Sequence, residues 1–365
     1  MATQFISNHR LTALDAFRGA TMAFMVLVNN PGDGKYSYAP LQHADWDGWT
    51  PTDVVFPSFV WIVGVAITLA MGRKLEAGHT PGALLLQAAK RAAIIFALGL
   101  LVYAFPSFDP ATFRILGVLQ RIAICYFVSS AIYLYAPLRG QFAAIVGLLA
   151  AYWAMMSFAP VPGFGAGHLD VQRNFAHYMD KIVLGAHNYA NTKTWDPEGI
   201  ISTLPAIASM LLGVMAGHIL ARKDALTAKI KYMTACGVAL FALGYLFDLA
   251  GFPINKKLWS CAFVLVMAGL DFVLLSGFLW LADVQGYKKV FTPFVIIGMN
   301  AIAIYMASEF FDTFANMFGW RGALYSIFSQ FASPVNASLL YALFNVLVMF
   351  AIAWFLHRRQ IFIRA

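Results

Sequence analysis

The feature that most constrains this chain of 365 residues is a succession of about ten apolar runs, each close to the length of a membrane span. A helix needs roughly 20 predominantly apolar residues to cross the hydrocarbon core of a bilayer. On that scale the predicted spans are 12–30, 53–72, 88–105, 114–136, 141–158, 198–220, 232–250, 259–282, 291–311 and 336–356. The sequence therefore predicts an all-α polytopic membrane protein, with residues 1–365 forming one transmembrane domain.

The composition agrees with a lipid surrounding. Charged residues make up 12% of the chain and hydrophobic residues 61%, whereas a soluble domain has about 25% charged residues. The net charge of +8 comes from Lys and Arg clusters between the apolar runs, with fifteen of these residues on one side of the predicted membrane and seven on the other. This asymmetry predicts that both termini are cytoplasmic. It argues against a nucleic-acid partner, which would require a basic face.

Two long connections, residues 31–52 and 159–197, fall on the outer side of this topology, and loops of that length tend to be functional. The first connection and its flanks contain Asn29, Asn30, His43, Asp45, Trp46, Asp47, Trp49 and Asp53. Histidine suits proton transfer near neutral pH, and a neighbouring carboxylate can fix its tautomer. A loop histidine is also often incidental, so the residues alone leave the role of His43 open.

Ionisable groups within the apolar runs are costly to bury and are candidates for function. Asp15 and Arg18 lie three residues apart on one predicted helix face. They either form an ion pair or leave Arg18 to face an anionic ligand from the cytosol. Gln120 and Arg121 fall inside a span, where Arg121 requires a partner, for which Asp271, Asp15 and a bound phosphate are the alternatives.

Other polar residues do not decide the class of protein. Asn300 and Glu309 indicate a polar interior near the ninth span. Cys125, Cys236 and Cys261 lack the spacing of a metal site or a disulfide framework. A secondary transporter predicts two repeated halves, and the sequence shows no such repeat. These features alone do not separate an enzyme from a transporter.

Several long motifs occur in order along nearly the whole chain, from about Leu11 to the end. They read LDAFRGATMAFMVLVNNPG, QHADWDGWTPTDVVFPSFVWIVG, LGVLQRIAICYF, DPEGIISTLPAIASMLLGVMAG, INKKLWS and GMNAIAIY. In these motifs the chain resembles the heparan-α-glucosaminide N-acetyltransferase family of transmembrane acyltransferases, including its bacterial NagX-type members. The resemblance implies acetyl transfer from cytosolic acetyl-CoA to the amine of glucosamine, or of a glucosamine-containing saccharide, on the periplasmic side of a bacterial inner membrane.

The resemblance also implies roles for single residues. His43 is the expected catalytic histidine, and Asn29 is the expected active-site asparagine, with Asn30 as the neighbouring alternative. Asp45, Asp47 and Asp53 are candidates to orient the imidazole or to hold the sugar, and we place Asp45 and Asp53 with the catalytic residues. The residues expected to hold acetyl-CoA are Arg18, Gln120, Arg121 and Asn300. The residues expected to contact the acceptor sugar are Asn30, Trp46, Asp47, Trp49, Glu198 and Glu309.

The expected mechanism is general-base catalysis, in which His43 takes a proton from the sugar amine and Asn29 stabilises negative charge on the thioester oxygen. A covalent acetyl-histidine intermediate is the rival route. An O-acyltransferase of a cell-envelope glycan is an alternative function, and a sugar transporter is the alternative from another class. No metal is expected, and a homodimer is compatible with the sequence.

Overall fold

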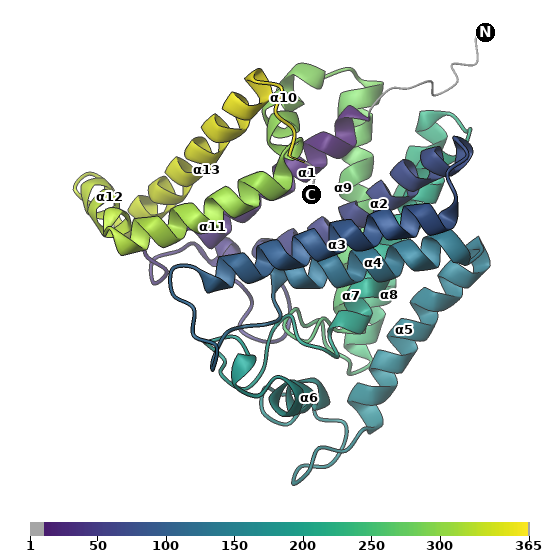
Figure 1. Ribbon diagram of the computed structural model, residues 1–365, viewed down its shortest axis with the longest axis horizontal. Coiled ribbons are helices and arrows are strands. Elements are labelled where there is room, and N and C mark those ends of the chain that lie inside the picture. The colour runs from purple at the N-terminus through teal and green to yellow at the C-terminus, as the bar shows by residue number, and fades with distance from the viewer. Residues whose placement is uncertain (1–10, 364–365) are drawn as a thin grey trace.

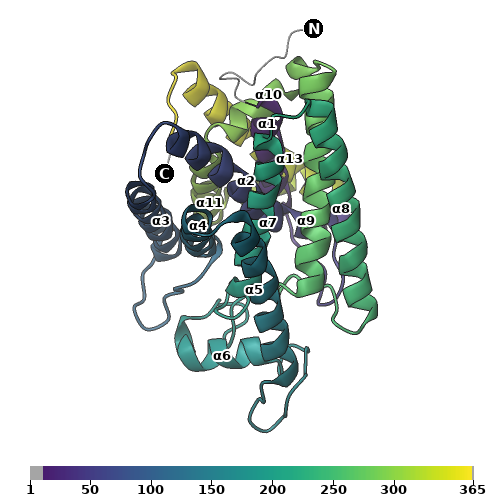
Figure 2. The same ribbon diagram turned by 90° about the vertical axis from the view of Figure 1, so that its right-hand side faces the viewer.

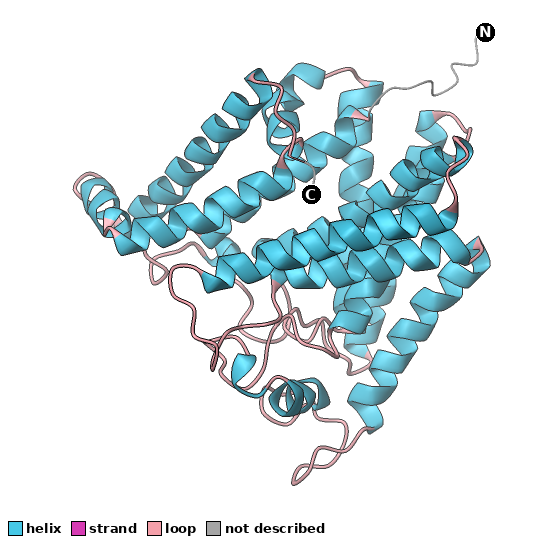
Figure 3. Ribbon diagram, viewed as in Figure 1, coloured by secondary structure: helices cyan, strands magenta, loops and turns pink. Residues whose placement is uncertain are grey.

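The computed structural model describes residues 11–363, and within that range the chain is helical and contains no β-strand (Figures 1 and 3). The helices are α1 (Thr12–Asn29), α2 (Val55–Glu76), α3 (Pro81–Ala104), α4 (Val118–Tyr135), α5 (Leu138–Phe158), α6 (Phe175–Val183), α7 (Thr203–Ala221), α8 (Leu226–Leu249), α9 (Cys261–Phe278), α10 (Lys288–Gly298), α11 (Ala301–Met317), α12 (Trp320–Ser329) and α13 (Pro334–Arg358). Short 3₁₀ turns lie at Ala39–Leu41, Pro51–Val54 and Gly185–His187, and a π-helical segment, Leu279–Val284, extends α9. The predicted all-α class is confirmed.

Eight of the described helices are long and apolar enough to cross a membrane: α2, α3, α4, α5, α7, α8, α9 and α13. Helices α10 and α11 are apolar enough only when taken together, and they are bent by 66° at the break between them, as in a broken span or a re-entrant loop. The remaining predicted span, residues 12–30, corresponds to α1, an 18-residue helix that contains Asp15 and Arg18. The molecule is therefore a polytopic helical membrane protein. Arg10 and Arg364, two of the cations counted on the inner side, lie outside the described residues.

Three spans form the centre of the bundle. In α2, α7 and α9, 72% of the most apolar stretch is buried within the protein, compared with 17% in α3 and α8. Helices α3, α5, α8 and α13 therefore present most of their surface to lipid. Helices α2 and α7 cross closely at Gly64 and Gly213, where an added Cβ would lie 1.9 Å from the carbonyl oxygen of Met210 and 2.0 Å from that of Trp61. Small residues allow such close packing of membrane helices.

The longest connections gather at one end of the bundle, beside α6 (Figures 1, 2 and 3). The loop between α1 and α2, residues 30–54, contacts the loop between α5 and α7 there, because Trp46 Nε1 donates a hydrogen bond to the carbonyl oxygen of Leu169. It also contacts the segment before α9, since the N–H of Gly48 donates to the carbonyl oxygen of Ile254 at 2.7 Å. Three stretches that are far apart in sequence thus meet on the side predicted to be outer.

Candidate active site

Asp53 is a buried, fixed carboxylate in the loop between α1 and α2. The sequence Thr50-Pro51-Thr52-Asp53 forms a capping box that starts the 3₁₀ turn before α2. Asp53 Oδ2 accepts hydrogen bonds from the N–H of Ala44 at 3.0 Å, the N–H of Thr50 at 3.0 Å and the Thr50 hydroxyl at 3.2 Å. The Asp53 side chain is 1% exposed. Local sequence thus holds this carboxylate in one orientation.

The second oxygen of Asp53 orients His43. Asp53 Oδ1 lies 2.7 Å from His43 Nδ1, and the imidazole is 47% exposed. An ionised carboxylate only accepts hydrogen bonds, so Nδ1 carries the proton and Nε2 keeps its lone pair. Of the three aspartates considered as supports for the imidazole, the structure places Asp53 against it. The pair has the arrangement of a general base whose tautomer is fixed by a carboxylate.

Lys256, in the segment of residues 254–260 that precedes α9, lies against this pair. Its Nζ is 3.0 Å from His43 Nδ1, 3.4 Å from His43 Nε2 and 3.4 Å from Asp53 Oδ1. Burial lowers the pKa of Lys256, and the carboxylates of Asp53 and Glu198 oppose that shift. Glu198, expected to contact the sugar, is therefore close enough to act electrostatically on the same site.

Asp45 and Asp47 do not contact the imidazole, and both are tied to the 254–260 segment. Asn255 Nδ2 donates a hydrogen bond to Asp47 Oδ1 at 3.1 Å. Lys257 Nζ donates to the backbone carbonyl oxygen of Asp45. These contacts place the loop that carries His43 against the segment that carries Lys256.

The two tryptophans predicted to bind sugar also make contacts within the protein. The Trp46 ring packs edge-on against the rings of His177 and Trp195, and His177 stacks on Trp195 at a centroid distance of 4.0 Å. Trp49 Nε1 donates to the hydroxyl of Tyr245 at 3.1 Å. Trp46 therefore joins the two outer loops, while Trp49 contacts α8.

Glu198 belongs to a cluster centred on Arg114. Two guanidinium nitrogens of Arg114 bind Asp196 at 2.8 and 2.7 Å, and Nη2 also donates to Glu198 Oε2 at 2.6 Å. Arg114 Nη1 donates to the hydroxyl of Tyr103 at 3.0 Å, and the guanidinium lies between the rings of Tyr103 and Tyr189. A bidentate pair of this kind fixes both partners. Glu198 is thus an oriented carboxylate facing the polar end of the bundle.

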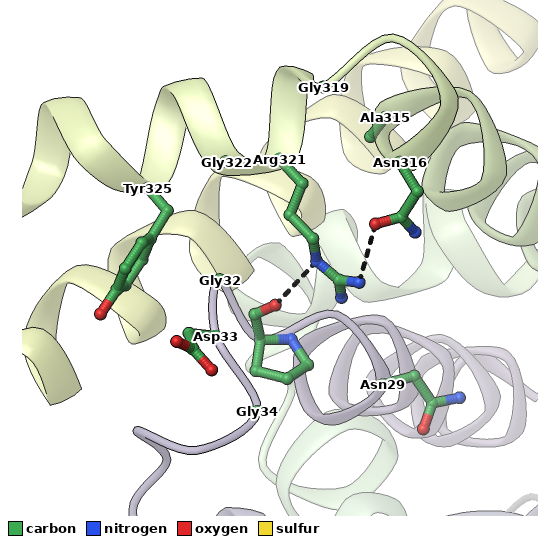
Figure 4. A pocket seen from close by; sticks show the side chains of 11 residues that line it. Asn29, Gly32, Asp33, Gly34, Ala315, Asn316, Gly319, Arg321, Gly322 and Tyr325 are labelled. Carbon is green, nitrogen blue, oxygen red and sulfur yellow. Dashed lines mark hydrogen bonds between the residues drawn. The ribbon is translucent and has the colours of Figure 1, made fainter. Parts of the chain in front are cut away.

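Asn29, at the end of α1, lies in a pocket of about 490 Å³ whose lining does not include His43 (Figure 4). Arg321 crosses this pocket and donates hydrogen bonds to the carbonyl oxygen of Pro31 and to Asn316 Oδ1, both at 3.2 Å. Asp33 and Tyr325 complete the polar lining. Within residues 11–363 no hydrogen bond joins Asn29 to His43, and the shared catalytic role expected for them stays a prediction.

Asn30 points into the bundle instead. Its side chain is buried and donates to the carbonyl oxygen of Val26 at 2.8 Å and to the hydroxyl of Ser308 at 3.3 Å. Ser308 precedes Glu309 on α11, and Glu309 forms a hydrogen bond with Tyr305 one turn earlier. Asn30, which follows α1, thus contacts α11 at the residue next to Glu309, and both were expected to contact the sugar.

A second cavity, of about 410 Å³, follows one face of α2. Its α2 lining is formed by Phe56, Phe59, Val63, Ala66, Ile67, Ala70, Met71 and Arg73. From Phe56 to Arg73 the helix rises roughly 25 Å, and Phe56 is one helical turn from Asp53. Arg18, Arg73 and Arg91 supply the cationic groups of this cavity, whereas most other lining residues are apolar. The cavity therefore runs from a cationic end toward the His43 site.

Only one of the four residues expected to hold acetyl-CoA lines this cavity. Arg18 lines the cavity, and its Nη1 also lies 3.1 Å from Asp15 Oδ1. Arg18 therefore forms the ion pair with Asp15 and borders the cavity at the same time. Arg121 is buried elsewhere: Nη2 donates to the carbonyl oxygen of Gly199 and to the Ser202 hydroxyl. This differs from the partners expected for Arg121, and the guanidinium also lies over the Trp259 ring.

Asp271, considered as a partner for Arg121, accepts a hydrogen bond from Ser58 instead. Gln120 and Asn300, the other two residues expected to hold acetyl-CoA, do not line the cavity either. Gln120 is fully buried beside Gly99. Asn300 uses both ends of its amide on the C-terminal segment, donating to the carbonyl oxygen of Ile361 at 3.1 Å and accepting from the N–H of Ile363 at 2.8 Å. Ile363 lines the cavity, so Asn300 contributes to it only through that segment.

Sequence reasoning missed Lys256 and Arg114. Lys256 lies within the INKKLWS motif, where it reads as an ordinary loop cation. Arg114 lies at the edge of a predicted span, and this position alone signals a cation that needs a partner. Neither signal identifies the acidic residue that the cation meets, because these partners lie far away along the chain: Lys256 meets Asp53, and Asp196 and Glu198 are 82 and 84 positions from Arg114.

A bundle of apolar helices, with a histidine held by a buried carboxylate in one of its loops, defines a polytopic helical membrane protein. The family model described as "Heparan-alpha-glucosaminide N-acetyltransferase, catalytic" matches residues 10–246. The chain belongs to this family, and the resemblance seen in the motifs is confirmed.

Two curated relatives agree. The chain is 32% identical to the human heparan-alpha-glucosaminide N-acetyltransferase, in an alignment that covers 86% of this chain and 54% of the human protein. It is 30% identical to the mouse protein of the same name, over 87% of this chain and 56% of that protein. The chain thus spans about half the length of the curated relatives it matches.

Proposed function

We propose that this protein is a transmembrane acetyltransferase that moves an acetyl group from acetyl-CoA to the amine of glucosamine or of a glucosamine-containing saccharide. The observation that carries the proposal is the Asp53 carboxylate against His43 Nδ1, which leaves Nε2 as a base in a half-exposed loop. The names of the curated relatives support the acyl group and the acceptor. We further propose that one domain performs the whole reaction.

The chemistry follows from the protonation state of the imidazole. A protonated amine is not nucleophilic, so the ammonium group first releases one proton to water, and a base must take a second proton as the amine attacks. The amine nitrogen attacks the carbonyl carbon of the thioester, a C–N bond forms, and His43 Nε2 takes the proton. The C–S bond then breaks, and the departing thiolate receives the proton from His43. Asp196 and Glu198 place two carboxylates against the single charge of Arg114, and this excess favours an ammonium group in the region.

The cavity along α2 suits the acyl donor. A polyanionic nucleotide favours guanidinium groups, which bind phosphate bidentately, and Arg18, Arg73 and Arg91 provide them. The apolar face that continues toward Phe56 suits the long, weakly polar pantetheine arm. Because the cationic end belongs to the side predicted as cytoplasmic, we propose that the donor enters from the cytosol and the sugar from the periplasm. A catalytic role for Asn29 stays a prediction.

The test uses the purified protein in detergent with acetyl-labelled acetyl-CoA and glucosamine, and mass spectrometry of the product. We expect an N-acetylated sugar from the wild type, and a turnover lower by about 10²–10⁴-fold in His43→Ala. His168→Ala is the matched control, because this second outer-loop histidine contacts only the carbonyl oxygen of Phe164 among its described hydrogen-bond partners. It should transfer acetyl at the wild-type rate.

The outcomes separate the alternatives. Product formed only with a hydroxyl acceptor would identify an O-acyltransferase, and uptake of sugar by proteoliposomes without acetyl transfer would identify a transporter. Either result would overturn the proposal. Acetyl label trapped on His43 in the absence of acceptor would replace direct transfer by the route through an acetyl-histidine.

A further inference from the structure

Lys256 stands in an unusual relation to the proposed base. It comes from the segment before α9, 213 positions from His43, yet its Nζ lies within 3.4 Å of both ring nitrogens. The charged groups that face the imidazole are Asp53 from the turn before α2 and Lys256, with Glu198, Lys257, Asp45 and Asp47 around them. A carboxylate and an ammonium group therefore act on one imidazole from different elements.

The two charges have opposite effects on proton uptake by His43. A carboxylate in direct contact favours the imidazolium form, whereas a cation within about 4–6 Å disfavours it. A carboxylate alone beside the imidazole would favour the imidazolium form, which has no lone pair to take a proton from the substrate. With Lys256 present, the charge of Asp53 is balanced before the imidazole is protonated.

We propose that Lys256 is a positioning residue that keeps His43 in its neutral, proton-accepting form, an inference that rests on the proposed function of His43 as the base. Asp53 then fixes the tautomer of the imidazole while Lys256 sets its strength as a base. The two requirements are met by different residues, and neither residue has to touch the sugar.

Two carboxylates stabilise the charged form of Lys256 against the burial that lowers its pKa. Its ammonium lies 3.4 Å from Asp53 Oδ1, and Glu198 adds a second nearby carboxylate. The backbone hydrogen bond between Gly48 and Ile254 and the contact between Asn255 and Asp47 hold the segment in place. Lys256 is therefore fixed beside the ring by contacts that do not involve its own side chain.

The experiment measures the neutral fraction of His43 directly. Diethyl pyrocarbonate acylates neutral imidazole, and the half-exposed ring of His43 is open to it. The full-length protein in detergent is labelled at pH values from about 5 to 8, the range in which histidine titrates. Mass spectrometry of the peptide that contains His43 gives the pH at half-maximal labelling. We expect Lys256→Met to raise this midpoint by about one pH unit.

Two further variants make the comparison specific. Lys256→Arg keeps the positive charge and should keep the wild-type midpoint. Lys257→Met removes the neighbouring cation and its contact with the carbonyl oxygen of Asp45. The hydrogen bonds from Gly48 to Ile254 and from Asn255 to Asp47 still join the segment to the loop, so the midpoint should stay unchanged. Lys256→Gln serves if the Met variant fails to fold, because the amide still donates to Asp53. Thermal unfolding confirms that each variant is folded.

Acetyl transfer provides the second measurement, and the two results can be told apart. The acid limb of the turnover profile should move upward with the labelling midpoint in Lys256→Met. An unchanged labelling midpoint in a folded Lys256→Met or Lys256→Gln variant would overturn the inference while leaving the acetyltransferase proposal standing. A wild type that transfers no acetyl group would overturn the proposed function, and the labelling would still decide what Lys256 does to His43.

Discussion

Replacing Asp53 by asparagine removes one charge and preserves the shape of the side chain. In the structure the carboxylate accepts four hydrogen bonds, from His43 Nδ1, the N–H of Ala44, and the N–H and hydroxyl of Thr50. An amide has one accepting oxygen and one donating NH₂ group. Asparagine at position 53 can therefore accept the loop hydrogen bonds or the imidazole proton, but not both.

The losses of stability and of turnover in Asp53→Asn depend on which of these hydrogen bonds the amide keeps. Three of the four donors belong to the loop, so the amide oxygen should turn toward Ala44 and Thr50, leaving the NH₂ group against His43 Nδ1. Weakening hydrogen bonds to a buried charged group costs about 1.5–3 kcal/mol of unfolding free energy. The imidazole must then accept at Nδ1, which places its proton on Nε2, where the substrate proton should go. A base in the wrong tautomer lowers turnover by up to about 10⁴-fold.

The assay for Asp53→Asn combines thermal unfolding in detergent with acetyl transfer to glucosamine. Thr50→Val is the control, because it removes a hydroxyl from the same capping box without touching the imidazole. It should cost about 1 kcal/mol of unfolding free energy and retain turnover. The reasoning is refuted if folded Asp53→Asn keeps more than about a tenth of wild-type turnover, since loss of an oriented general base cannot be that mild.

Two further predictions test the donor cavity and the pH response. Arg73→Ala should raise the KM for acetyl-CoA about tenfold, the equivalent of one lost phosphate contact, and more so at low salt. Arg121→Ala should leave that KM unchanged and lower Tm, because it removes contacts to Gly199 and Ser202 and opens a cavity costing about 2–5 kcal/mol. Burial raises the pKa of Asp180 from 3.8 to about 6. The folded state therefore keeps a proton that the unfolded chain releases, and through this group the free energy of unfolding should fall as pH rises between these values. Asp180→Asn should remove this part of the pH dependence of Tm.

The membrane spans were predictable because hydropathy and length determine them directly. A run of about 20 apolar residues has few alternatives to a spanning helix. Hydropathy and length do not predict a bend within a span, so the run 291–311 predicted a single span where the structure has α10 and α11 meeting at 66°. The break falls next to Gly298, where α10 packs so closely on α1 that an added Cβ would lie 2.1 Å from the carbonyl oxygen of Asp15. That contact is tertiary, and the local sequence does not reveal it.

The site was predictable where its contacts are local. His43 and Asp53 are ten positions apart, and the capping box that fixes Asp53 can be read from four consecutive residues. The structure was needed to choose Asp53 over Asp45 and Asp47, because all three aspartates lie close to His43 in the sequence and any of them could contact the imidazole. Arg121 illustrates the opposite case. Its need for a partner was evident, but a helical residue can face several neighbours, and the partner came from the turn before α7.

Local and tertiary contacts determine different properties of His43. The family model ends at residue 246, whereas the segment that carries Lys256 lies beyond it. The tautomer of His43 is set within the matched region, by a carboxylate ten residues away. On the inference made for Lys256, the basicity of His43 is set from outside that region, by a cation that only tertiary packing brings near. Two chains with the same His and Asp motif but different residues at position 256 should therefore hold equally oriented imidazoles of unequal strength as bases.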